Sequence, residues 1–115
     1  MLNQPFSPAQ GQTQAVAVTS AQTTIGIDPM SKQVRVLNPN AFPVYVRCSV
    51  GTAASPAVPA VVPVVGTPGD YPIGPNSSEV VTKSDTYGAM SLIADATKSG
   101  TVYVTPGEGY QSAAA

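Results

Sequence analysis

The sequence predicts an all-β protein, a single-domain β-sandwich with jelly-roll or Greek-key connections. Valine and threonine alternate with other residues along most of the chain, and clusters of Pro, Gly and Asn interrupt this alternation about every ten residues. Leucine occurs only three times. Side chains that branch at Cβ fit a pleated sheet, whereas Pro, Gly and Asn favour turns. A chain of 115 residues is the usual size of one domain.

The first half of the domain contains three strands that are separated by turn sequences. Alternation begins at residues 14–18, resumes at 23–27 and returns at 33–37. Residues 28–31 (DPMS) have the composition of a turn in which Pro sets φ at the second position, and residues 38–40 (NPN) make the next turn.

The clearest strand pattern covers residues 44–50, and we expect a central strand that is paired on both sides. Its alternation predicts four side chains that face the core, Val44, Val46, Cys48 and Val50, and three that face outward, Tyr45, Arg47 and Ser49. Cys48 is the only cysteine, so no intrachain disulfide is possible, and we interpret it as a small buried apolar residue.

Residues 51–69 form a stretch rich in Ala, Pro, Val and Gly. Because Pro lacks the backbone donor that a central strand needs, the stretch predicts a long loop or an edge segment. Residues 58–65 (VPAVVPVV) are too apolar for a solvated linker. We therefore expect residues 58–65 to pack against another surface instead of lying free in water.

The second half adds a short extended segment, predicted at residues 70–73, and three strands, predicted at residues 79–82, 89–94 and 101–105. Residues 74–77 (GPNS) are predicted to form the turn before the first of these strands. Residues 89–94 (AMSLIA) also have the propensity for a helical turn, but their length and neighbours favour a strand. The final strand is predicted to end at Pro106-Gly107.

The two ends of the chain lie outside the predicted sandwich, which covers residues 13–106. Residues 1–12 have no periodic pattern and predict a flexible N-terminal arm, in which Phe6 follows Pro5 as the only large aromatic side chain. Residues 107–115 predict a loose C-terminal tail.

The charge content is low and bears on the partners of the protein. Charged residues make up 10% of the chain, and five basic residues against six acidic ones give a formal net charge of −1. The basic residues are scattered, which argues against nucleic acid. Weak net repulsion favours self-association, as a homodimer ahead of a homotrimer. The start of the chain lacks the pattern of a signal peptide, and its longest apolar run is short and contains prolines, so we expect no membrane segment.

Residues suited to catalysis are scarce, and we expect a protein that is not an enzyme and has no cofactor or metal. The chain has no histidine, and its Ser–Lys neighbours would point to opposite faces of a strand. Its aspartates stand singly in separate turns, which does not suit calcium. Five tyrosines either line a sugar-binding surface or serve as strand and interface residues.

Three stretches together resemble one family of proteins. They are residues 33–47 (QVRVLNPNAFPVYVR), 71–80 (YPIGPNSSEV) and 99–109 (SGTVYVTPGEG). In this strand-and-turn chemistry the chain resembles the capsid decoration proteins of short-tailed bacteriophages, also called stapling or cement proteins, over roughly residues 13–109.

The resemblance implies a structural virion protein that binds the outer surface of a phage capsid and clamps neighbouring major capsid subunits. It also implies a protein made in the host cytoplasm and located on the capsid surface. The alternatives are a receptor- or carbohydrate-binding module of a phage fibre or spike, and a head–tail connector component. The candidate residues for contact with the capsid or with another subunit are Pro5, Phe6, Val58, Val61, Val62, Val64 and Val65.

Overall fold

The computed structural model describes residues 7–27, 31–51, 60–84 and 86–108. These residues form nine strands and no helix. The strands are β1 (Ser7–Pro8), β2 (Gln14–Val18), β3 (Thr23–Gly26), β4 (Gln33–Asn38), β5 (Val44–Ser49), β6 (Tyr71–Ile73), β7 (Ser77–Thr82), β8 (Ala89–Ala94) and β9 (Gly100–Glu108).

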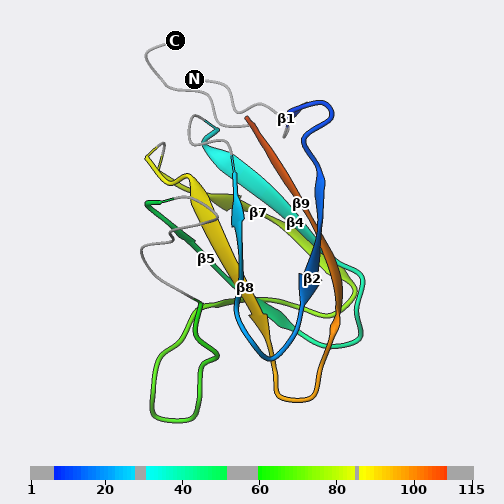
Figure 1. Ribbon diagram of the computed structural model, residues 1–115, viewed down its shortest axis with the longest axis vertical. Helices are drawn as coiled ribbons and strands as arrows, with labels where there is room; N and C mark the ends of the chain where they lie inside the picture. Colours follow the sequence, from blue (N-terminus) through cyan, green and yellow to red (C-terminus); the bar gives the residue numbers. More distant parts are fainter. Residues whose placement is uncertain (1–6, 28–30, 52–59, 85, 109–115) are drawn as a thin grey trace.

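The strands form two antiparallel sheets that pack face to face (Figure 1). One sheet has the order β2-β9-β4-β7, with β1 also paired to β9, and the other has the order β3-β8-β5-β6. Strand pairs are therefore nested along the chain: β5 pairs with β6, β4 with β7, β3 with β8 and β2 with β9. This nesting is the connectivity of a jelly roll. The predicted all-β sandwich is confirmed.

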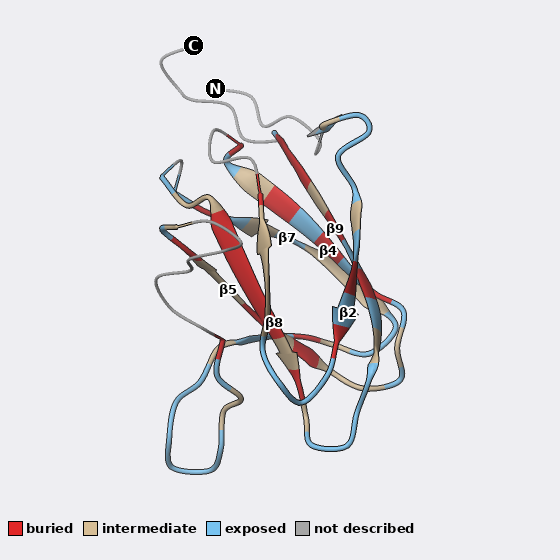
Figure 2. Ribbon diagram, in the orientation of Figure 1, coloured by how far each residue is buried: buried red, intermediate tan, exposed pale blue. Residues whose placement is uncertain are grey.

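The core lies between the two sheets and follows the period of two that is visible in the sequence. In β4, Val34 and Val36 are fully buried, whereas Arg35 and Leu37 between and after them are exposed. Figure 2 shows the same alternation as buried and exposed bands along the strands. The buried core cluster consists of Val16, Val18, Ile27, Val34, Val36, Val44, Val46, Ile73, Met90, Leu92, Val102 and Val104.

A buried asparagine joins the turns at one end of the sandwich. The Nδ2 group of Asn38 donates to the backbone carbonyls of Phe42 at 2.8 Å, Gly74 at 3.1 Å and Ile73 at 3.2 Å. Its Oδ1 accepts from the backbone and side-chain amides of Asn40, at 3.1 Å and 2.9 Å. Asn38 is fully buried, so these bonds replace the water that its amide loses on folding.

The predicted strand positions agree closely with the structure for β2 and β8, which span the residues expected. The helical alternative for residues 89–94 is thereby excluded. β5 is paired on both sides, with β6 and β8, as predicted.

The predicted facing is wrong at the end of β5. Val50 is exposed, Ser49 is buried, and Cys48 is only half-buried although it packs against the core. Pairing of β5 ends at Ser49, opposite Ala89, so the alternation that places Val44 and Val46 in the core does not extend further.

The structure also differs from the predicted ends of the domain. Ser7–Pro8, inside the predicted arm, pairs with Glu108 and Gly107. β9 continues through Pro106, which has no N–H group, to Glu108. The carbonyl of Pro106 accepts from the N–H of Ala9, and in a strand the N–H and C=O of one residue point to the same neighbour. The side of Pro106 that lacks an N–H group therefore faces the gap between β1 and β2, and no hydrogen bond to β4 is lost. Residues 1–6 and 109–115 lie outside the described residues.

Candidate functional site

A projecting hairpin is the most distinctive surface feature of the described chain. Residues 61–70 leave the sandwich, reverse direction and return to the start of β6, extending beyond the sheets at the lower left of Figure 1. At the reversal, Val64 and Thr67 form an isolated bridge with two backbone hydrogen bonds of 2.9 Å and 3.2 Å. We call this segment the 61–70 hairpin.

Two glycines allow the chain to fold back in this way. Gly66 has a φ of 85°, a left-handed value that favours glycine at the third position of a tight turn. At Gly69 a Cβ atom would overlap the backbone of Pro63, so only glycine permits the two arms of the hairpin to approach. The local sequence Pro63 to Gly69 therefore specifies the turn.

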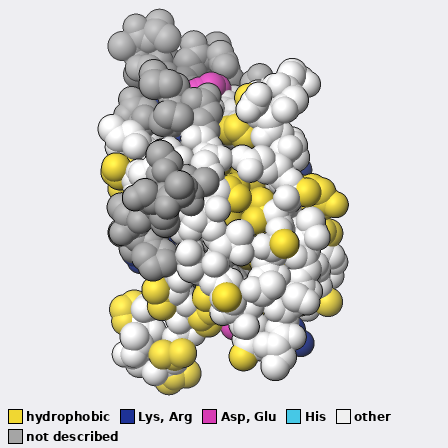
Figure 3. All heavy atoms as spheres, in the orientation of Figure 1, with side chains coloured by type: hydrophobic (Ala, Val, Ile, Leu, Met, Phe, Trp, Pro, Cys, Tyr) yellow, Lys and Arg dark blue, Asp and Glu magenta, His cyan; other side chains and the backbone are white. Residues whose placement is uncertain are grey.

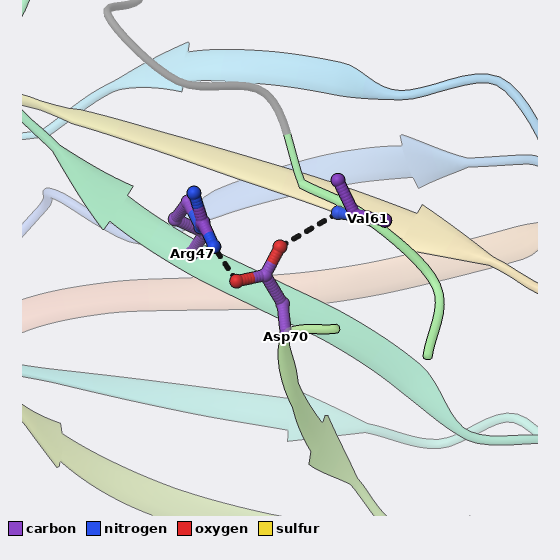
Figure 4. A network of polar contacts seen from close by, with 3 residues as sticks. All are labelled: Arg47, Val61 and Asp70. Atoms are coloured by element: carbon purple, nitrogen blue, oxygen red, sulfur yellow. Dashed lines mark hydrogen bonds and ion pairs between the residues drawn. The ribbon is translucent and has the colours of Figure 1, made fainter. Parts of the chain in front are cut away.

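One carboxylate holds the base of the hairpin against β5 (Figure 4). Asp70 accepts from Nε of Arg47 at 2.5 Å and from the N–H of Val61 at 2.6 Å. The backbone N–H of Asp70 also donates to the carbonyl of Val61 at 2.9 Å. The Asp70 side chain is 8% exposed, whereas that of Arg47 is 36% exposed. A largely buried carboxylate with two charge-assisted bonds is a firm anchor.

The far end of the hairpin is apolar and open to water. Val64 is 60% exposed, and Val65, at the turn, is fully exposed. Figure 3 shows hydrophobic side chains gathered at the lower left, where the hairpin projects. Burying a valine side chain contributes about 1.5–3 kcal/mol, so this exposure favours contact with another surface.

The predicted contact residues are only partly brought together. Val61, Val62, Val64 and Val65 all lie in the 61–70 hairpin, with Val62 half-buried. Pro5, Phe6 and Val58 lie outside the described residues. Sequence reasoning missed the role of Arg47 and Asp70. Their only signal in the sequence is a basic residue at an outward position of the predicted strand 44–50 and an acidic residue directly after the 51–69 stretch.

The tyrosines do not gather at one site in the described chain. Tyr103 lies on β9 of one sheet, and Tyr45 and Tyr71 lie on β5 and β6 of the other. The Tyr71 hydroxyl donates to Glu79 of β7, so it links the neighbouring edges of the two sheets. Burial raises the pKa of Tyr45, and the charge of Asp95 and a hydrogen bond to it add to this effect.

Neither a metal-binding cluster nor a membrane-spanning helix occurs in the described residues. Among residues 7–27, 31–51, 60–84 and 86–108, no three His, Cys, Asp or Glu side chains form a cluster that fits a metal ion. Within that part of the chain, no helix has the length and apolar character needed to span a bilayer.

Comparison with protein-family models, with curated proteins and with solved structures gave no match for this chain.

Proposed function

We propose that this protein is a structural virion protein that binds the outer surface of a phage capsid and clamps neighbouring major capsid subunits. The observation that carries the proposal is the apolar tip of the 61–70 hairpin, which is held at its base by Asp70. The resemblance of residues 33–47, 71–80 and 99–109 to decoration proteins supports the choice of partner. The fold alone does not, because jelly rolls serve many functions.

A fixed apolar tip suits binding to a repeated surface. Because the hairpin is anchored before it meets a partner, little conformational freedom remains to be lost on binding. A shell presents the same site many times, so modest contacts from many copies sum to a large stabilisation of the particle. In the free protein the same exposed tip favours self-association, as a dimer ahead of a trimer.

The test starts from a phage whose genome carries this coding sequence. Deletion of this reading frame from the genome gives particles that lack the protein. Purified protein is added back, and bound protein is measured by co-sedimentation. We expect saturable binding by the wild type and binding at least about tenfold weaker by the double variant V64D/V65D. The variant S20D/A21D adds the same charge to the exposed β2–β3 turn and serves as the control.

Absence of wild-type binding would overturn the capsid proposal. If V64D/V65D binds the particles as tightly as the wild type does, the capsid remains the partner, but the hairpin tip is not the contact.

A further inference from the structure

The outer face of the sheet β2-β9-β4-β7 is a second exposed surface, separate from the 61–70 hairpin. Its side chains alternate with the buried valines of the same strands and therefore point away from the core. Three large apolar side chains there are exposed: Leu37 at 41%, Tyr103 at 40% and Val80 at 43%. Ala15 continues this face on β2, directly opposite Tyr103.

A groove of about 540 Å³ lies on this face, lined by Pro8, Thr13, Arg35, Leu37, Tyr103 and Thr105. Its floor consists of two cross-strand pairs of β4 and β9, in which Leu37 lies opposite Tyr103 and Arg35 opposite Thr105. Pro8 reaches the groove only because β1 pairs with the end of β9. We call it the outer-face groove.

Arg35 is the one charged side chain that lines the groove, and it has no carboxylate partner in the described residues. Its guanidinium donates to Ser78 Oγ at 3.1 Å. The ion pair of Arg47 with Asp70 lies on the other sheet. A guanidinium carries five N–H donors, and a partner that covers it must supply acceptors or leave a charge buried without compensation.

A second copy of this chain does not fit the outer-face groove. In a twofold dimer the same patch meets itself, so the Arg35 side chains of both copies would lie within one interface. No carboxylate lines the groove to separate the two charges. Like charges brought together in an interface oppose association.

A sugar also fits the groove less well than a protein segment. The hydroxyls of Thr13 and Thr105 bond each other at 2.8 Å, and Arg35 uses the Ser78 hydroxyl, so several polar groups are already paired within the sheet. The remaining lining is Pro8, Leu37 and Tyr103. Beyond the groove, the exposed Val80 lies on the same face, directly opposite Arg35. An exposed surface with large apolar side chains that include Tyr, beside an Arg, is typical of a protein–protein contact.

We propose that the outer-face groove binds a segment of the major capsid protein that is apolar and carries one Asp or Glu, whose carboxylate pairs with Arg35. This inference rests on the proposed function and adds the chemistry of a second contact. The hairpin extends from the β5 and β6 side of the molecule, and the groove lies on the opposite sheet. Two contacts on different sides allow one subunit to engage two neighbours in the shell.

The experiment repeats the add-back to particles that lack the protein, with charge variants of Arg35. We expect Arg35→Glu to weaken binding about 30-fold or more, and Arg35→Lys to weaken it much less because the charge is kept. The control Lys98→Glu makes the same change of charge in the exposed β8–β9 turn. Circular dichroism melts confirm that each variant is folded.

The outcomes separate this inference from the proposed function. Wild-type protein that fails to bind particles overturns the proposed function and this inference with it. If the wild type binds and a folded Arg35→Glu variant binds equally well, the groove proposal alone is overturned.

In a separate arm, oligogalacturonate is titrated into the free protein. Shifts of the Tyr103 and Arg35 NMR signals that the neutral oligosaccharide dextran does not reproduce would assign the groove to an acidic sugar and overturn the protein partner.

Discussion

Asp70 and Arg47 are separated by 23 residues in the sequence, and their side chains meet at 2.5 Å across the base of the 61–70 hairpin. The second oxygen of the same carboxylate accepts the N–H of Val61 at 2.6 Å. One side chain thus fixes both where the hairpin leaves the sandwich and where it returns.

Replacing Asp70 with Ala should release the hairpin while leaving the sandwich folded. The bonds that it removes hold a surface segment, and such segments open locally with little effect on global unfolding. We expect faster hydrogen exchange at the amides of Val61, Val64 and Thr67, and a change in global stability of about 1 kcal/mol or less. Arg47→Ala keeps the bond from Val61 and should have the smaller effect on exchange. A large global loss in Asp70→Ala would show that the hairpin belongs to the cooperative core.

Replacing Asn38 with Ala should destabilise the fold strongly. The variant removes the partner of three backbone carbonyls and of the Asn40 amides at a fully buried position. We expect a loss of about 2–4 kcal/mol in urea titrations. Asn38→Asp keeps the oxygen that faces Asn40 but turns an acceptor toward the carbonyls, and it should be at least as harmful. Wild-type stability in either variant would contradict the assigned network.

The two faces of β5 should respond differently to polar substitutions. Val46 is 4% exposed in the core cluster, so Val46→Asp buries an unpaired charge and should cost several kcal/mol. Tyr45 is only half-buried on the opposite face, and Tyr45→Ser should cost much less. The comparison is made by urea titration. Equal losses would mean that the register of β5 is wrong.

Cys48 should make stability depend on alkaline pH. Burial raises the pKa of its thiol above the ordinary 9.0, while the charge of Lys83 acts in the opposite direction. The unfolded chain therefore loses this proton at a lower pH than the folded protein. The thiol's contribution is complete below about pH 9 and is lost as pH rises through the folded pKa. Cys48→Ala should flatten the decline of unfolding free energy as pH rises above about 9, as measured by urea titration. An unchanged slope would contradict a raised pKa.

The free protein should be a dimer whose formation depends on the hairpin tip. Light scattering at high concentration should give twice the monomer mass for the wild type and the monomer mass for V64D/V65D. Arg35→Glu should remain a dimer, because the outer-face groove does not suit self-contact. A wild-type monomer would mean that Val64 and Val65 stay exposed until another partner covers them.

Much of the sandwich was predictable from the sequence because strand facing is a local property. The period of two places Val34 and Val36 in the core wherever β4 lies in the sheet, and Pro, Gly and Asn mark where strands must end. The apolar character of the hairpin is also a local property, because the sequence has too many valines between its prolines for a solvated linker.

Pairing between distant segments was decided only by the tertiary structure. A two-residue strand such as Ser7–Pro8 has no periodicity of its own and exists because β9 offers an edge. Pro106 stays in a strand because its missing N–H meets an interruption, which depends on where β1 and β2 lie. The Arg47–Asp70 anchor and the outer-face groove likewise join residues far apart in sequence. The alternation of side chains shows which face a residue occupies, but which strand lies beside it follows from how the two sheets close around one core.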